Sequence, residues 1–201
     1  MGDLHFSAGD ETLWAVILGA FLATIGGYVS TTLEAASRRR EREHGAALLF
    51  GEILSVLELL IDMAKTARGI GQPYGSFTLR LLRAVRRETE TYERNRESLY
   101  DLRDVRSRAQ IHTIMVKTIL ALEGVFDATE RIEADSVVVR QAGLDEISRA
   151  EVEARIATAL EDRERAFNAL GETALGIAPI VEVLRPLAKQ DFRVYSAVAT
   201  A

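Results

Sequence analysis

The amino-acid sequence predicts an all-α protein in which a single N-terminal transmembrane helix continues into an antiparallel cytoplasmic bundle of about four helices. Three observations predict this class. Thr12 to Leu33 contains no charged residue, and only 3 prolines interrupt the 201 residues. Beyond this segment, apolar residues recur every three or four positions, as they do on one face of an α-helix. The content of 48% hydrophobic and 27% charged residues is typical of a folded chain.

The segment 12–33 has the length of a membrane-spanning helix. At 1.5 Å per residue it would be about 33 Å long, and the hydrocarbon core of a bilayer is about 30 Å thick. Trp14 and Tyr28 stand toward its two ends, where aromatic residues are enriched at membrane interfaces. The residues before it are acidic rather than basic, which argues against a cleaved signal peptide.

Arginines predict the orientation of this helix. Residues 1–11 contain no Lys or Arg, whereas Arg38, Arg39, Arg40 and Arg42 follow the segment directly. Cytoplasmic loops carry the excess of basic residues, so the N-terminus is expected outside and the remainder in the cytoplasm of a bacterial cell. The four arginines then form a basic collar that faces lipid. The predicted divisions are a short extracytoplasmic tail (1–11), a transmembrane helix (12–33), a cytoplasmic helical bundle (34–189) and a C-terminal tail (190–201).

Small residues recur at every fourth position inside the predicted span. Such residues form a groove on one helix face where a second backbone can approach closely. This spacing predicts a packing face for self-association or for another membrane helix. Its members are Ala15, Gly19, Ala23, Gly27 and Thr31.

Two cytoplasmic helices are expected before residue 100. The first continues from the membrane through 34–68 and ends at Gly69, which has the C-terminal position that glycine favours. The second begins near Ser76 after a loop rich in Gly and Pro. The apolar stripe predicted for the first helix comprises Leu49, Ile53, Val56, Leu57, Leu60 and Ala64, and that for the second comprises Leu82, Val85, Thr89 and Tyr92.

Two further helices are expected after residue 100. The third runs from about Leu102 to Ile132, and 133–147 is expected to be a connection. The fourth begins at Ser148, which with Glu151 has capping-box spacing, and its apolar stripe keeps its phase through Pro179. A kinked but continuous helix is therefore expected there. On the third helix the predicted inner face comprises Val105, Ala109, His112, Val116, Ile119 and Phe126.

Charge is expected to differ between the two ends of this bundle. In an antiparallel arrangement, the connection between the second and third helices and the end of the fourth lie at the membrane end. Both regions are rich in arginine, whereas 123–151 at the opposite end is acidic. A membrane with anionic lipids would favour this arrangement, in which the basic end faces the lipid and the acidic end faces away from it.

One alternative function is an enzyme. The run Arg106-Ser-Arg-Ala-Gln-Ile-His112 resembles the Arg–His pair, four to six residues apart, of HEPN ribonucleases, which are themselves helical bundles. The resemblance implies a membrane-tethered ribonuclease or defence effector that uses Arg106 or Arg108 with His112. Arg39 and His44 have the same kind of spacing, however. Because His112 shares a helical stripe with apolar residues, a core or interface histidine is the competing interpretation.

Composition excludes several other site classes. The chain has 0 cysteines and 3 histidines, so thiol nucleophiles, disulfides and Cys-ligated metals are excluded. Glu41-Arg-Glu-His44 has the Glu-x-x-His spacing of di-iron bundles, but no second copy follows. No metal or cofactor is expected, and the net charge of −5 disfavours a nucleic-acid partner. We therefore expect a binding protein rather than an enzyme, either a scaffold or adaptor or an accessory subunit of a membrane assembly. Its expected partners are lipid and either a second copy of the chain or another membrane protein. A membrane-linked sensor is a further alternative.

Overall fold

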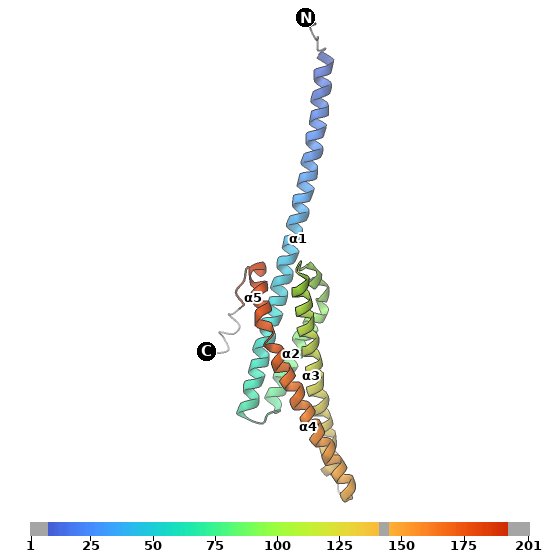
Figure 1. The fold of residues 1–201 in the computed structure, drawn as a ribbon, viewed down its shortest axis with the longest axis vertical. Helices are drawn as coiled ribbons and strands as arrows, with labels where there is room; N and C mark the ends of the chain where they lie inside the picture. Colours follow the sequence, from blue (N-terminus) through green and yellow to red (C-terminus); the bar gives the residue numbers. More distant parts are fainter. Residues whose placement is uncertain (1–7, 141–144, 193–201) are drawn as a thin grey trace. The chain divides into compact units, whose positions relative to one another are not determined.

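The computed structural model describes residues 8–140 and 145–192, with their side chains from Leu18 onward except that of Val29. Over these residues the chain forms five α-helices and one 3-10 helix, with no strand. The helices pack against one another (Figure 1), so the all-α prediction is confirmed. In chain order they are α1 (Ala8–Ile70), α2 (Ser76–Arg94), η1 (Arg96–Asp101), α3 (Val105–Arg140), α4 (Glu146–Ala174) and α5 (Ile177–Ala188).

The chain divides into two compact units, Met1–Arg42 and Glu43–Ala201. In the first unit the described residues belong to α1, and every described side chain is exposed. Large apolar side chains are among them, which is unusual for a surface in water. They are Leu18, Phe21, Leu22, Ile25, Tyr28 and Leu33, each more than 40% exposed.

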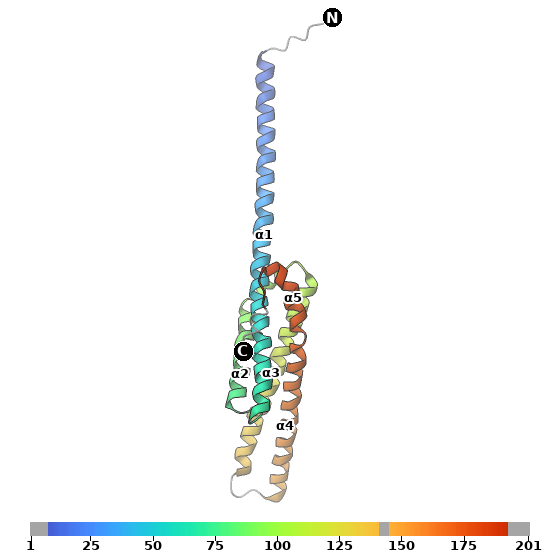
Figure 2. The same ribbon diagram turned by 90° about the vertical axis from the view of Figure 1, so that its left-hand side faces the viewer.

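In the second unit, α3 and α4 run antiparallel and lie side by side in both ribbon views (Figure 2). A Cβ on Gly124 would lie 3.0 Å from Cβ of Ala166, and farther along α3 the carboxylate of Asp135 pairs with Arg155 at 2.6 Å. As the residue number rises along α3, the number of the contacting residue on α4 falls, as it does between antiparallel helices. The pair extends beyond the loop that joins α1 to α2.

One hydrophobic core joins the helices of the second unit. The predicted inner face of α2 is confirmed, since all four of its members are buried. Ile53, Leu57 and Ala64 of α1 are buried as expected, while Leu49 and Leu60 are partly buried against them. The largest fully buried side chains are Tyr92, Phe50, Phe192, Leu54, Leu57, Ile61, Leu82, Leu102, Ile111, Met115, Leu122 and Leu170.

The prediction for α3 is wrong in two respects. The helix continues to Arg140, so most of the expected connection at 133–147 is helical. Pairing with α4, as at Asp135 and Arg155, stabilises the extra turns although three consecutive valines have poor helix propensity. The inner face is also rotated: Val105 and Val116 are 65% and 39% exposed. The buried face is Ser107, Ile111, Ile114, Met115, Thr118, Ala121, Leu122, Val125, Ala128 and Thr129.

The start of α4 also differs from the prediction. Asp145 is its N-cap, and Asp145 Oδ1 accepts a hydrogen bond from the Ser148 backbone N–H at 2.6 Å. Aspartate and serine are both favoured N-caps, and they stand three residues apart here. The aspartate therefore adds one turn to the helix before the predicted serine.

The expected continuous helix through Pro179 is interrupted at Leu175–Gly176, between α4 and α5. The N–H groups of these two residues donate to carbonyls three residues earlier, those of Glu172 and Thr173. Proline lacks an N–H, and its ring crowds the carbonyl four residues before it, which here belongs to Leu175. The helix is therefore interrupted at the residue whose carbonyl the ring of Pro179 would crowd.

Two helical stretches in the described part of the chain are long and apolar enough to cross a membrane, namely Val105–Arg140 and Glu146–Ala188. The helices that form the core of a folded unit satisfy the same criterion. Both stretches contribute buried side chains to the second unit, among them Ile111, Met115, Leu170 and Leu184. Part of their apolar surface therefore belongs to this core, while Leu120 and Leu175 are 61% and 75% exposed.

Candidate functional site

The predicted membrane-packing residues lie on α1 in the first unit. Gly19, Ala23, Gly27 and Thr31 are exposed, and the side chain of Ala15 lies outside the described residues. A Cβ added to Gly19 or Gly27 would meet nothing within 4 Å. The described part of the chain therefore leaves both glycines open to a neighbouring helix.

The four arginines of the predicted collar follow on the same helix and are exposed. Arg38 Nη2 lies 3.4 Å from Glu34 Oε2, with the two side chains 76% and 62% exposed. Exposed pairs of this kind contribute at most about 1 kcal/mol in water. The positive charge of Arg38 thus remains accessible to an anionic surface.

A groove of about 300 Å³ opens in the second unit beside η1 and the start of α3. Arg108 and His112 stand four residues apart, so they lie on the same side of α3. The groove thus contains two of the three residues of the alternative catalytic prediction. We call it the arginine groove, and its lining residues are Arg96, Leu99, Tyr100, Val105, Arg108, Ala109 and His112.

Arg108 is held in this groove by an aromatic ring. Its guanidinium carbon lies 5.8 Å from the ring centroid of Tyr100, a side chain that is 73% exposed. Arg108 Nε is buried and has no hydrogen-bond partner within the described residues. A buried N–H donor without an acceptor is costly, so an incoming oxygen would be favoured there.

His112 connects α3 to the core. Its Nδ1 is hydrogen-bonded to the Tyr92 hydroxyl at 2.8 Å. The Tyr92 ring is 1% exposed and packs edge-on against Phe50, with ring centroids 6.0 Å apart. Burial raises the pKa of Tyr92, while the nearby Arg96 acts in the opposite direction. The hydroxyl therefore stays protonated, and His112 has a structural partner on α2.

Arg106 lies apart from this groove. Its side chain is exposed, and its backbone N–H donates to Asp104 Oδ1 at 3.1 Å. Asp104 Oδ2 accepts from the Ser107 backbone N–H at 2.9 Å. These hydrogen bonds, first those from Ser107, lower the pKa of Asp104. Asp104 thus caps α3, and the structure brings His112 together with Arg108 rather than with Arg106.

The start of the second unit lies close to this groove. Glu43 forms an ion pair with Arg103 at 3.1 Å and accepts its backbone N–H at 3.2 Å. His44 Nδ1 donates to the Leu187 carbonyl at 2.9 Å. The first turn of the unit, the link between η1 and α3, and the end of α5 therefore meet.

The same contacts involve two residues of the Glu41-Arg-Glu-His44 motif, whose spacing is that of a di-iron ligand pair. Glu43 and His44 are engaged by Arg103 and the Leu187 carbonyl, and the described residues contain no group of three or more acidic or histidine side chains placed to hold a metal.

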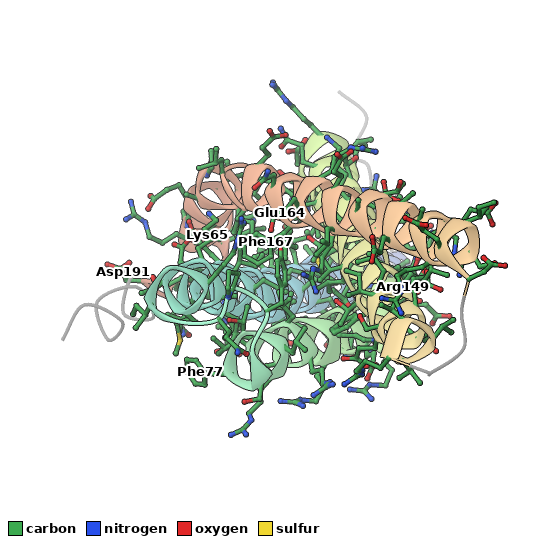
Figure 3. The ribbon with its side chains drawn as sticks, turned by 90° about the horizontal axis from the view of Figure 1, so that it is seen from below. Lys65, Phe77, Arg149, Glu164, Phe167 and Asp191 are labelled. Atoms are coloured by element: carbon green, nitrogen blue, oxygen red, sulfur yellow. The ribbon has the colours of Figure 1, made fainter. Side chains whose placement is uncertain are left out.

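A second polar cluster had no clear signal in the sequence. Arg68 of α1 lies over the rings of Phe167 and Tyr74, at 4.7 and 5.6 Å from their centroids, and forms an ion pair with Glu164. Arg163 lies 3.9 Å from the Tyr74 centroid. Figure 3 shows Glu164 and Phe167 near the end of α1. We call this group the arginine–aromatic cluster.

Burial determines the electrostatics of this cluster. It lowers the pKa of Arg163. Burial, followed by the nearby Glu164 carboxylate, raises the pKa of Tyr74 to about 12. Arg163 stands at an interruption of the apolar stripe of α4, which was the only signal available in the sequence. Tyr74 lies in the loop after α1, where periodicity predicts nothing.

No family model matches the chain, and neither a curated protein nor a solved structure is significantly similar to it.

Proposed function

We propose that this chain is a single-pass protein of the bacterial inner membrane that acts by binding, as a scaffold or adaptor or as an accessory subunit of a membrane assembly. Residues 12–33 span the bilayer in this proposal, with the N-terminus outside. The observation that carries it is the charge-free stretch whose described large apolar side chains, from Leu18 to Leu33, are exposed. Burying apolar surface contributes about 25 cal/mol per Å², so a bilayer would stabilise this helix strongly.

The remainder of the chain is proposed to be a cytoplasmic antiparallel bundle. Contacts between successive helices support this arrangement: Phe50 packs on Tyr92 from α1 to α2, Tyr92 binds His112 from α2 to α3, and Asp135 pairs with Arg155 from α3 to α4. α3 and α4 belong to this bundle because their apolar side chains form its core.

Topology tests the proposal directly. The chain should remain in the membrane fraction after carbonate extraction, and a C-terminal reporter that works only in the cytoplasm should be active. Extraction into the soluble fraction would refute the membrane anchor. Activity of a periplasm-only reporter at the same position would refute the orientation.

Self-association through the small-residue face is the second part of the proposal. Gly19→Ile and Gly27→Ile retain a hydrophobic span but block close backbone approach, so insertion should persist while crosslinked oligomers decrease. Because a Cβ at either position meets nothing within 4 Å, the change should leave the monomer intact. Gly26→Ile is the matched control, since it has equal space but lies outside the four-residue spacing. Equal oligomer yields for all three variants would refute this packing face.

The ribonuclease alternative is favoured only by the position of Arg108 and His112 in one groove. It predicts that purified full-length protein degrades RNA and that His112→Gln abolishes degradation without lowering the melting temperature. The binding proposal predicts no such activity. Affinity isolation in mild detergent, followed by mass spectrometry, would distinguish a stoichiometric membrane partner from self-association alone.

A further inference from the structure

We infer that the arginine groove binds the phosphate group of an anionic phospholipid headgroup. This inference rests on the proposed membrane anchor and adds a specific ligand class to it.

The side chains of the groove suit a phosphate ester. Arg96 and Arg108 supply two guanidinium groups, whose planar N–H donors match phosphate oxygens. Arg108 Nε is buried without an acceptor in the described chain, so it lacks the partner that a phosphate oxygen would provide. Stacking on Tyr100 restricts the guanidinium without neutralising it, unlike an ion pair with a carboxylate.

The groove has a size and a rim that fit a headgroup. Its volume of about 300 Å³ is at the lower end of the range for small-molecule sites. Tyr100 and Val105 at the groove are 73% and 65% exposed. An aromatic side chain beside arginines is typical of the membrane interface, where the ring contacts acyl chains and the cations contact phosphate.

Few residues along the chain separate the proposed span from Glu43, which contacts the segment that precedes α3 at this groove. Arg103, in the link between η1 and α3, binds Glu43. Glu43 lies on α1 ten residues after Leu33, which is about 15 Å along a helix.

Lipid retention provides the test. Full-length protein is placed in nanodiscs of phosphatidylcholine with and without phosphatidylglycerol, and the lipids retained after release are counted by native mass spectrometry. Wild type should retain phosphatidylglycerol preferentially. The pair Arg96→Gln and Arg108→Gln should weaken retention at least about fivefold, as expected for removal of a basic residue near an anionic surface.

Arg80→Gln with Arg83→Gln is the matched control, because it removes the same charge from exposed positions of α2. It should retain lipid like wild type. Arg96→Gln alone, at an exposed position, should weaken retention even if the Arg108 substitution disturbs folding. Equal retention by groove and control variants would overturn the inference.

Two further measurements separate other phosphate sources. Calorimetric binding of glycerol 3-phosphate without any effect of the groove variants on lipid retention would reassign the groove to a soluble phosphate. RNA degradation abolished by Arg108→Gln would reassign it to the ribonuclease alternative. Both outcomes overturn the lipid inference while leaving the anchor, which carbonate extraction tests separately, unaffected.

Discussion

Replacing Gly51 with alanine tests how the end of the described chain packs on α1. Gly51 is buried, and a Cβ added to it would overlap the ring of Phe192, a side chain that is 2% exposed. Gly45 lies six residues earlier in the same helix, and a Cβ there would meet nothing within 4 Å. The two positions therefore share a backbone conformation and differ in their surroundings.

The two substitutions should change stability in opposite directions. Alanine is preferred over glycine in a helix interior by about 1 kcal/mol, so Gly45→Ala should increase the free energy of unfolding by about that amount. At Gly51 the same gain is opposed by displacement of the phenylalanine ring, whose burial contributes about 1.5–3 kcal/mol. The net effect of Gly51→Ala is a loss of about 0.5–2 kcal/mol.

Urea unfolding of the full chain in a neutral detergent, followed by far-UV circular dichroism, measures both changes. Phe192→Ala completes a double-mutant cycle: without the ring, Gly51→Ala should become stabilising, as it is at Gly45. If Gly51→Ala stabilises the protein while Phe192 is present, the packing of Phe192 on α1 is refuted.

Three further substitutions test contacts within the second unit. Tyr92→Phe should lower the free energy of unfolding by about 1 kcal/mol because His112 loses its hydrogen-bond partner, and an unchanged urea midpoint would contradict that role. Glu164→Gln should also destabilise, because Arg68 loses its ion pair; high salt should narrow the difference from wild type, and a salt-independent difference would exclude an electrostatic cause. Hydrogen bonds lower the pKa of Asp104 from its ordinary 3.8, so its contribution is present above that pH and is lost as the pH falls toward the folded-state value. Melting temperatures between neutral pH and the acid range should therefore converge for wild type and Asp104→Asn, and a constant gap would contradict the assignment.

Periodicity and composition determined the helical class and much of the core. The buried stripe of α2 was predictable because its members recur every three or four residues and most of the residues between them are charged. All four predicted inner residues, Leu82, Val85, Thr89 and Tyr92, are buried. The charge-free segment 12–33 was likewise evident from composition, and its role in the membrane remains a prediction.

The buried face of α3 was predicted incorrectly from periodicity because this helix has two apolar faces. Val105 and Val116 lie on one face, and Ile111 and Met115 on the other. Only packing against the neighbouring helices buries one of them, since helical periodicity by itself does not distinguish competing apolar faces. The choice between Asp145 and Ser148 as N-cap was open for a similar reason, because each has the appropriate chemistry.

The candidate site was partly predictable in the same sense. The four-residue spacing of Arg108 and His112 places them on one side of a helix, which local geometry alone determines. Tyr92 and Tyr100 reach them from other segments, and Arg163 meets Tyr74 across two segments that lie far apart in the chain. Such long-range contacts depend on how the helices pack, so only the tertiary structure could decide that His112 is tied to the core and that Arg108 is held by a ring.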